Sequence, residues 1–170
     1  MAGQRGRRRR LHDVTIVATV DTGWVIAAEQ NVTAARRLVA AFAQLGRMLV
    51  VPPVVVVEAR QRAASLGAVD DILAQLEGEP HTPMDGRRAS DLLREAGRHA
   101  AGQGIDASAR IHAIGTADAL VAAMAERLGG LVYTADPQHM EWLRDAGARI
   151  TIQPVPDFTK ASSDRRRGRR

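Results

Sequence analysis

The sequence contains no cysteine, and this absence removes several classes of site at once. Without cysteine there is no disulfide framework, no thiolate ligand for a metal and no cysteine nucleophile. Zinc fingers and cysteine-based catalysis are therefore excluded. The absence is compatible with a reducing compartment.

Long apolar runs and aromatic residues are also scarce. No stretch approaches the roughly 20 apolar residues that a membrane span requires, so we expect no membrane association and a cytoplasmic protein. Just five aromatic side chains occur among the 170 residues. With so few, Trp24 and Trp142 are more typical of packing residues than of a base-stacking surface.

Positive charge is concentrated at the two ends of the chain. Residues 1–10 contain five arginines, and residues 161–170 contain five arginines and one aspartate. The intervening residues 11–160 carry 14 basic and 18 acidic side chains, so the middle of the chain is mildly acidic. We predict one domain over residues 13–156, with basic tails at 1–12 and 157–170. Such tails either attract a polyanion such as RNA or act as solvated segments.

The pattern of apolar residues predicts alternating strands and helices. Residues 14–20 are continuously apolar, as in a strand that is buried on both faces of a parallel sheet. We predict further strands at 48–51, 131–134 and 149–153, with a short edge strand at 81–84. Helices are predicted at 22–29, from Asn31 or Thr33 to Gly46, and at 54–65, 68–76, 89–101, 116–128 and 137–146. This order predicts an α/β fold, a three-layer α/β/α sandwich around a mostly parallel sheet.

Four acidic residues occupy similar settings in this predicted fold. Asp21 follows the first strand, Glu58 lies in the helix after the second, Asp118 opens the helix capped by Thr116, and Asp136 follows strand 131–134. Each one alone is explained as a helix cap or a surface residue, but the four coincide. In a parallel sheet they meet at the carboxyl edge, where ligands bind.

A cluster of carboxylates without cysteine or a histidine group predicts a site for Mg²⁺ or Mn²⁺. Crowded carboxylates repel one another, so a cation is needed to keep them ionised together. A bound Mg²⁺ activates water and neutralises charge on a reacting phosphate. The pattern therefore favours phosphodiester hydrolysis.

Four segments, in this order, resemble the PIN-domain nucleases and most closely the VapC-type toxins of toxin–antitoxin pairs: VDTGWVIA, PPVVVVEARQR, GTADALVAAMAERLGG and LVYTADPQHMEWL. The likeness spans about residues 14–153. It implies an Mg²⁺- or Mn²⁺-dependent endoribonuclease that forms a homodimer and is inhibited by a cognate antitoxin protein. The resemblance places the metal ligands and catalytic residues at Asp21, Glu58, Asp118 and Asp136, with Thr22 and Thr134 in support. Gly23 departs from the family pattern, which often has a polar residue there.

Two other functions compete with this interpretation. A non-catalytic PIN-like module could bind RNA through its arginine-rich tails. A phospho-acceptor α/β protein would need a lysine beside its aspartate, and the sole lysine, Lys160, lies beyond the last predicted strand. His139 lies either near the acids or on a helix surface, and His112 could contact RNA.

Overall fold

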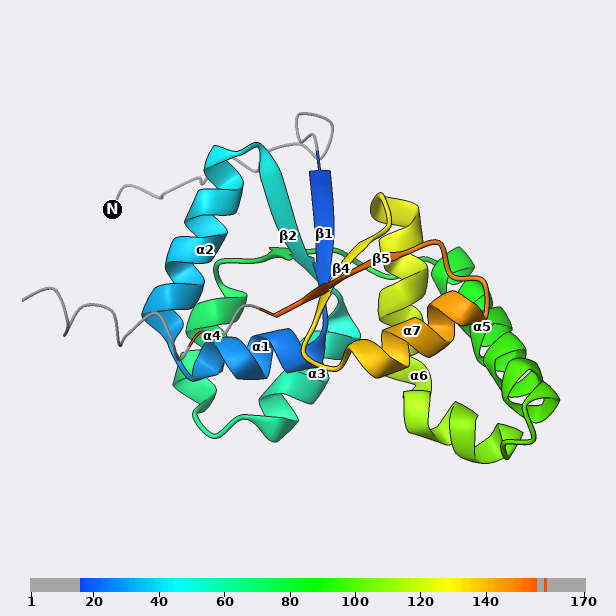
Figure 1. The fold of residues 1–170 in the computed structure, drawn as a ribbon. Coiled ribbons are helices and arrows are strands. Elements are labelled where there is room, and N and C mark those ends of the chain that lie inside the picture. The colour runs from blue at the N-terminus through cyan, green and yellow to red at the C-terminus, as the bar shows by residue number, and fades with distance from the viewer. Residues whose placement is uncertain (1–15, 156–157, 159–170) are drawn as a thin grey trace, which may run out of the picture.

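A five-stranded parallel sheet forms the centre of the molecule (Figure 1). The computed structural model of the protein describes residues 16–155 and 158. The strand order is β3-β2-β1-β4-β5. The strands are β1 (Ile16–Val20), β2 (Arg47–Val51), β3 (Glu77–Gly78), β4 (Leu131–Thr134) and β5 (Thr151–Pro154). The helices are α1 (Thr22–Glu29), α2 (Val32–Gln44), α3 (Pro53–Arg62), α4 (Leu66–Leu73), α5 (Pro83–Gly102), α6 (Ala107–Leu128) and α7 (Pro137–Asp145).

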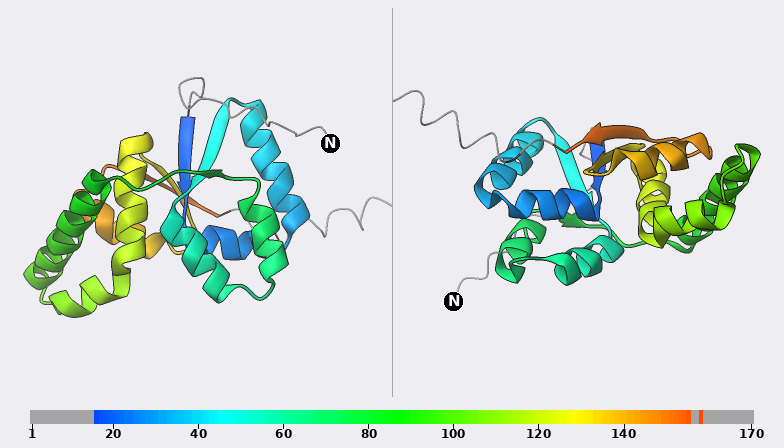
Figure 2. Two further views of the ribbon diagram at one scale, coloured as in Figure 1. Left: turned by 180° about the vertical axis from the view of Figure 1, so that it is seen from behind. Right: turned by 60° about the horizontal axis from the view of Figure 1, so that its bottom comes forward.

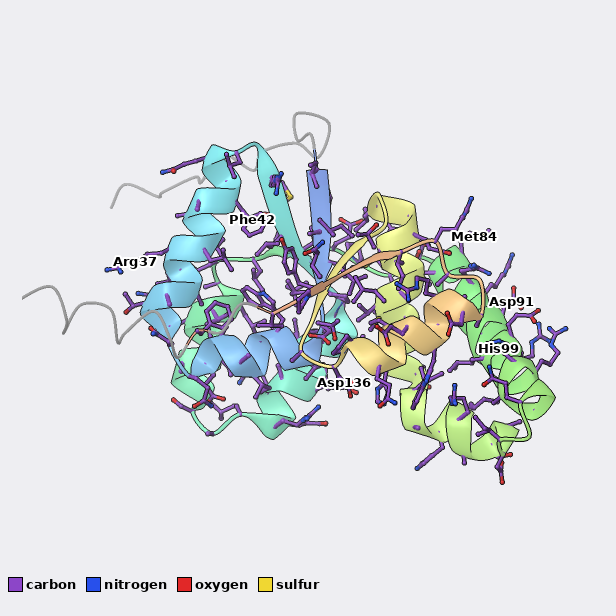
Figure 3. The ribbon with its side chains drawn as sticks, viewed as in Figure 1. Arg37, Phe42, Met84, Asp91, His99 and Asp136 are labelled. Carbon is purple, nitrogen blue, oxygen red and sulfur yellow. The ribbon has the colours of Figure 1, made fainter. Side chains whose placement is uncertain are left out.

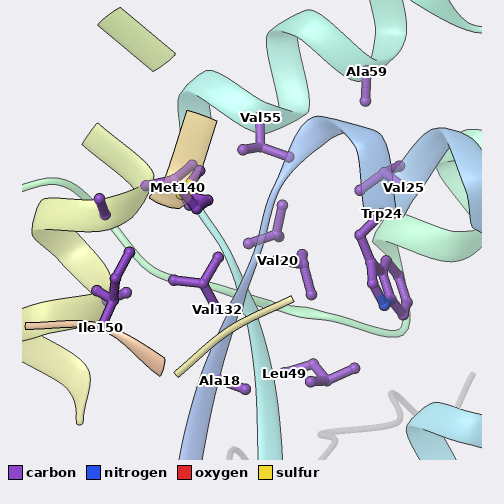
Figure 4. Close-up of a cluster of buried hydrophobic side chains, with 14 of the residues drawn as sticks. Ala18, Val20, Trp24, Val25, Leu49, Val55, Ala59, Val132, Met140 and Ile150 are labelled. Atoms are coloured by element: carbon purple, nitrogen blue, oxygen red, sulfur yellow. The ribbon is translucent and has the colours of Figure 1, made fainter. Parts of the chain in front are cut away.

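Helices cover both faces of this sheet, which confirms the predicted three-layer α/β fold (Figure 2). Ala18, Thr19 and Val20 are consecutive residues of β1, and all three are buried. Because successive side chains of a strand point to opposite faces, both faces of β1 must be covered. Figure 4 shows part of the resulting core, in which Val20 and Val132 lie near Met140 and Val55.

The first half of the chain follows the predicted pattern closely. Helix α1 has the predicted bounds, and the Asn31 side chain caps α2 by accepting a hydrogen bond from the Ala34 N–H. The segment after β2 is a helix, as predicted, because Pro53 occupies its first position, where a proline costs no hydrogen bond.

The predicted edge strand at 81–84 is wrong. The edge strand β3 is instead Glu77–Gly78, which pairs with the end of β2. Residues 82–85 form a capping box, in which Thr82 and Asp85 each bond the other's backbone N–H, and this starts α5 at Pro83. Helix α6 also begins earlier than the predicted helix at 116–128, because Asp106 caps it by accepting from the Ala109 N–H.

Helices α5 and α6 form an antiparallel pair that extends to one side of the sheet (Figures 1 and 2). Their close approach depends on Gly97, where an added Cβ would lie 2.8 Å from the Ile111 side chain. Helix α6 is broken at Gly115, whose φ of 76° and ψ of 164° are not helical. The predicted helix start at Thr116 corresponds to this break, and the helix ends at Gly129 in the left-handed region.

The described part of the C-terminal segment packs back onto the domain. Phe158 is buried, with its ring edge-on to Trp24 at a centroid distance of 5.8 Å. The Asn31 amide donates to the Phe158 carbonyl at 3.0 Å. Phe158 therefore belongs to the core although it falls within the predicted tail 157–170. The arginines of both predicted tails lie outside the described residues.

None of the described helices is long and apolar enough to cross a membrane.

A buried carboxylate anchors the start of α5 to the end of α6. Both oxygens of Asp85 accept from Arg127 Nε, at 3.0 and 3.1 Å, and Arg127 also donates to Glu79. Burial acts to raise the pKa of Asp85, but the hydrogen bonds from Arg127 and Thr82 outweigh it, and the pKa is lowered. The charged form of Asp85 therefore stabilises the fold.

We predict that Asp85→Asn lowers the free energy of unfolding by about 2 kcal/mol at pH 7, because it removes charge-assisted hydrogen bonds. Since the pKa of Asp85 is lowered on folding, its contribution is present above about pH 4 and disappears as the pH falls through the folded value. Urea denaturation at several pH values measures this difference. The control is Asp91→Asn, which removes an exposed i,i+3 pair with Arg94 and should cost less than about 0.5 kcal/mol (Figure 3). Equal losses for the two variants would contradict the prediction.

Candidate functional site

A cleft of about 420 Å³ opens at the carboxyl ends of the central strands. All four predicted acids line it, although they come from four separate segments of the chain. The adjacent parallel strands β1 and β4 end side by side, which brings Asp21 and Asp136 to the same edge. The cleft is lined by Asp21, Thr22, Gly23, Glu58, Arg62, Ala113, Ile114, Gly115, Thr116, Ala117, Asp118, Ala135, Asp136 and His139.

Asp21 is held at the floor of the cleft by both of its oxygens. Oδ1 accepts from the Trp24 N–H at 2.6 Å and so caps α1, while Oδ2 accepts from the Thr134 hydroxyl at 2.5 Å. The Thr134 hydroxyl also accepts from the Asp136 N–H at 2.9 Å. Thr134 thus connects the end of β1 to the start of α7. Asp21 is a helix cap, as its ordinary explanation requires, and it also lines the cleft.

Glu58 reaches the cleft from α3 and is oriented by the other predicted supporting residue. The Thr22 hydroxyl donates to Glu58 Oε2 at 2.7 Å. Thr22 follows Asp21 directly, so one turn of backbone positions two of the acids. The two predicted hydroxyl residues therefore each bind one predicted acid.

Asp118 and Asp136 both face His139. The His139 Nδ1 atom lies 2.8 Å from Asp118 Oδ2 and 3.7 Å from Asp136 Oδ2. Asp136 occupies the N-cap position of α7, but its side chain makes no capping hydrogen bond. It is labelled in Figure 3 at the junction of β4 and α7, and its side chain is 58% exposed. The explanation of Asp136 as an ordinary helix cap is therefore insufficient.

The glycine at position 23, where the family pattern often has a polar residue, is explained by steric crowding. A Cβ atom at this position would lie 2.7 Å from the Ala135 Cβ and 3.4 Å from Asp21 Oδ1. The first turn of α1 and the loop after β4 therefore approach each other more closely than any side chain allows. This close approach keeps Asp21 and Asp136 on one cleft.

The environment of the cleft disfavours the ionised form of two of its acids. Burial raises the pKa of Asp21 to about 6, against hydrogen bonds from Thr134 and Trp24, and the charge of Asp118 adds to the rise. Burial also raises the pKa of Asp118, helped by the charges of Glu58 and Asp136 and opposed by His139. The cleft therefore carries more negative charge than the surrounding protein compensates.

The donor chemistry of the cleft fits a hard divalent cation. The four carboxylates offer oxygen ligands only, which Mg²⁺ and Mn²⁺ prefer, and their mutual repulsion would be relieved by positive charge. Within the described residues, no three acidic or histidine side chains converge closely enough to hold one ion as they stand. Three of the acids are engaged by protein partners: Asp118 by His139, Asp21 by Thr134 and Trp24, and Glu58 by Thr22.

Three features of the cleft were only partly predictable. His139 lies by the acids rather than on a free helix surface, and its position three residues after Asp136 is the spacing that places two side chains on one helix face. Arg62 lines the cleft one turn after Glu58, and no pattern singled it out. Gly115 appeared only as part of the sequence before Thr116. Its positive φ explains why Asp118 begins a helix at the cleft.

Comparisons with known proteins support the fold. No family model matches the sequence, and neither does any of the curated proteins that were compared. Among solved structures, a chain in the crystal structure of VapBC2 from Rickettsia felis, bound to a DNA fragment from their promoter, matches with a TM-score of 0.60. The match covers 82% of this chain and 98% of that chain at 12% sequence identity. At this identity the likeness establishes a shared fold.

We predict that Asp21→Asn stabilises the protein in EDTA at neutral pH. The pKa of Asp21 is raised to about 6 from 3.8, so folding loses stability as Asp21 ionises between about pH 4 and pH 6. The asparagine keeps an oxygen for the Trp24 N–H but does not ionise. Its advantage over the wild type should grow over this interval to about 3 kcal/mol and stay constant above it. Urea denaturation from pH 4 to pH 8 measures the difference, and an unfolded variant or a constant difference would refute it.

Proposed function

We propose that this protein is a divalent-metal-dependent endoribonuclease of the PIN type and acts as the toxin of a toxin–antitoxin pair. One observation carries the proposal: four acids from four segments of the chain line one cleft at the carboxyl edge of a parallel sheet. Each acid stands at the position that the resemblance to VapC-type toxins assigns to it. The shared fold with a chain of a VapBC complex adds support.

In this proposal, Asp21, Asp118 and Asp136 hold Mg²⁺ or Mn²⁺, and Glu58 either holds it or orients a water molecule. When bound, the ion lowers the pKa of a water and offsets charge on the phosphate. Thr134 fixes the carboxylate of Asp21, and Thr22 fixes that of Glu58. These hydroxyls keep two acids in place before substrate arrives, so little reorganisation is required during the reaction.

The acidic character of the cleft explains why a cation would be needed. An RNA phosphate carries negative charge and would be repelled by four carboxylates. With the ion present, the same carboxylates no longer oppose the substrate. A bound ion would compete with His139 for the carboxylate of Asp118, and a His139 side chain released from that contact would be available to donate to a phosphate oxygen.

The resemblance also supplies the proposed partners. We propose that a cognate antitoxin protein binds this protein and blocks the cleft; the solved chain of the same fold belongs to a VapBC2 complex, which supports a partner of this kind. Homodimer formation and a cytoplasmic location stay predictions from the sequence.

Incubation of the purified protein with a pool of small cellular RNAs tests the activity. We expect discrete fragments with Mg²⁺ or Mn²⁺ and none with EDTA. Asp118→Asn should lower the rate at least about 100-fold, because it removes a proposed metal ligand. Thr134→Val should lower it about 10-fold, because Asp21 loses the hydroxyl that positions it. Asp91→Asn, a surface acid on α5 outside the cleft, is the matched control and should retain full activity.

Contamination by another nuclease is excluded only if the wild type and the three variants rank in this order. Cleavage that persists in Asp118→Asn would refute the proposed site. RNA binding in EDTA without cleavage in any metal would instead favour a non-catalytic module that binds RNA through its arginine-rich ends.

A further inference from the structure

The guanidinium of Arg110 lies over an aromatic ring beside the cleft. Its guanidinium carbon is 3.9 Å from the ring centroid of Trp142, a distance at which the cation attracts the π-face of the ring. Arg110 belongs to the part of α6 that precedes Gly115, and Trp142 belongs to α7, against which α6 packs. Trp142 packs against the core, as the sequence predicted, and part of its surface stays exposed.

Within the described residues, the side-chain N–H groups of Arg110 are not used for folding. Within residues 16–155 and 158, no carboxylate forms an ion pair with Arg110, whereas Arg88 and Arg127 are each bound to buried acids. A stacked guanidinium keeps its edge N–H groups available, and these match the geometry of a phosphate. Stacking on Trp142 fixes the orientation in advance, so little side-chain entropy is lost when an anion binds.

A continuous row of side chains connects Arg110 to the acids. The Trp142 ring lies 5.4 Å from the ring of His139, and His139 contacts Asp118 at 2.8 Å. Ala113 and Ile114, about one helical turn after Arg110, line the cleft themselves. Arg110 is thus the stacked cation at the border of a cleft that is otherwise dominated by carboxylates.

We propose that Arg110, held by Trp142, forms a subsite for a phosphate of the RNA strand next to the phosphodiester bond at the acids. The identification of the strand as RNA rests on the proposed function. Negative charge in the cleft repels the strand, so its neighbouring phosphate needs a fixed positive partner. Arg110 binds that phosphate, and Trp142 is a positioning residue that sets the direction of the guanidinium.

The intrinsic fluorescence of the protein reports on this subsite directly. The chain has two tryptophans, and Trp24 is fully buried against Phe158, away from solvent. A short single-stranded RNA of mixed sequence is titrated into the full-length protein in EDTA, so that no cleavage occurs. We expect a saturable change in emission that Trp142→Phe abolishes, because the bound phosphate alters the contact between Arg110 and the indole.

Variants of the cation measure its contribution. Because Arg110→Gln removes the contact that gives the emission change, binding by all cation variants is followed through the anisotropy of the same RNA carrying a fluorescent label. Arg110→Gln should raise the RNA concentration at the midpoint about 10-fold and reduce the slope of log affinity against log salt by about 0.7, the value for one lost phosphate contact on a single strand. Arg110→Lys keeps the charge but loses the planar guanidinium, and its midpoint should fall between those of the wild type and Arg110→Gln. The matched control is Arg37→Gln, which removes the same charge from the exposed side of α2 (Figure 3). Both arginine-rich ends are present in every variant, so their contribution cancels.

The outcomes separate this subsite from the nuclease activity. A midpoint for Arg110→Gln equal to that for Arg37→Gln would overturn the subsite, whether or not the wild type cleaves RNA. The absence of any emission change on RNA addition would overturn it too. Binding that depends on Arg110, in a protein that cleaves nothing in any metal, would uphold the subsite and refute the nuclease.

Discussion

The hydrogen bond between Thr134 and Asp21 is the interaction on which the site depends. It joins the ends of two neighbouring strands, and through the Asp136 N–H it also fixes the start of α7. Asp21 at the same time caps α1. One buried carboxylate thus determines where two helices leave the sheet. The raised pKa of Asp21 shows that this arrangement is electrostatically unfavourable without a compensating charge.

The parallel sheet explains how distant parts of the chain reach one cleft. In such a sheet every strand ends at the same edge, and every following helix begins there. Asp21 and Asp136 follow strands directly, and Glu58 lies in the helix after β2. Asp118 reaches the same edge differently, because the break at Gly115 starts a new helical segment beside it. The cleft is therefore a property of the topology, while its acidic chemistry is a property of four residues.

Much of this could be predicted from the sequence, because the relevant signals are local. The continuous apolar run before Asp21 indicated the central strand. The unbroken run EARQRAA correctly indicated a helix after the proline pair, despite the β-branched residues at 54–57. The predicted edge strand at 81–84 was wrong because the capping box at Thr82 and Asp85 competes with strand formation. Short edge strands carry almost no pattern of their own, since the two residues of β3 are defined only by their pairing with β2.

The side-chain partnerships of the site were harder to foresee. The contact of His139 with Asp118 depends on how α6 packs against α7, whereas spacing within one segment indicates only its approach to Asp136. The same holds for Trp142, because its contact with Arg110 joins α7 to a different helix.

The break at Gly115 divides α6 into a segment that carries Arg110 and a segment that carries Asp118. Arg110 lies five residues before the break, a distance of about 7 Å along the helix axis, and Asp118 lies just after it. A difference of about 20° in the dihedral angles of this one glycine corresponds to a shift of Arg110 by roughly 2 to 3 Å relative to Asp118. The backbone conformation of a single residue thus sets the spacing between the cation and the acids.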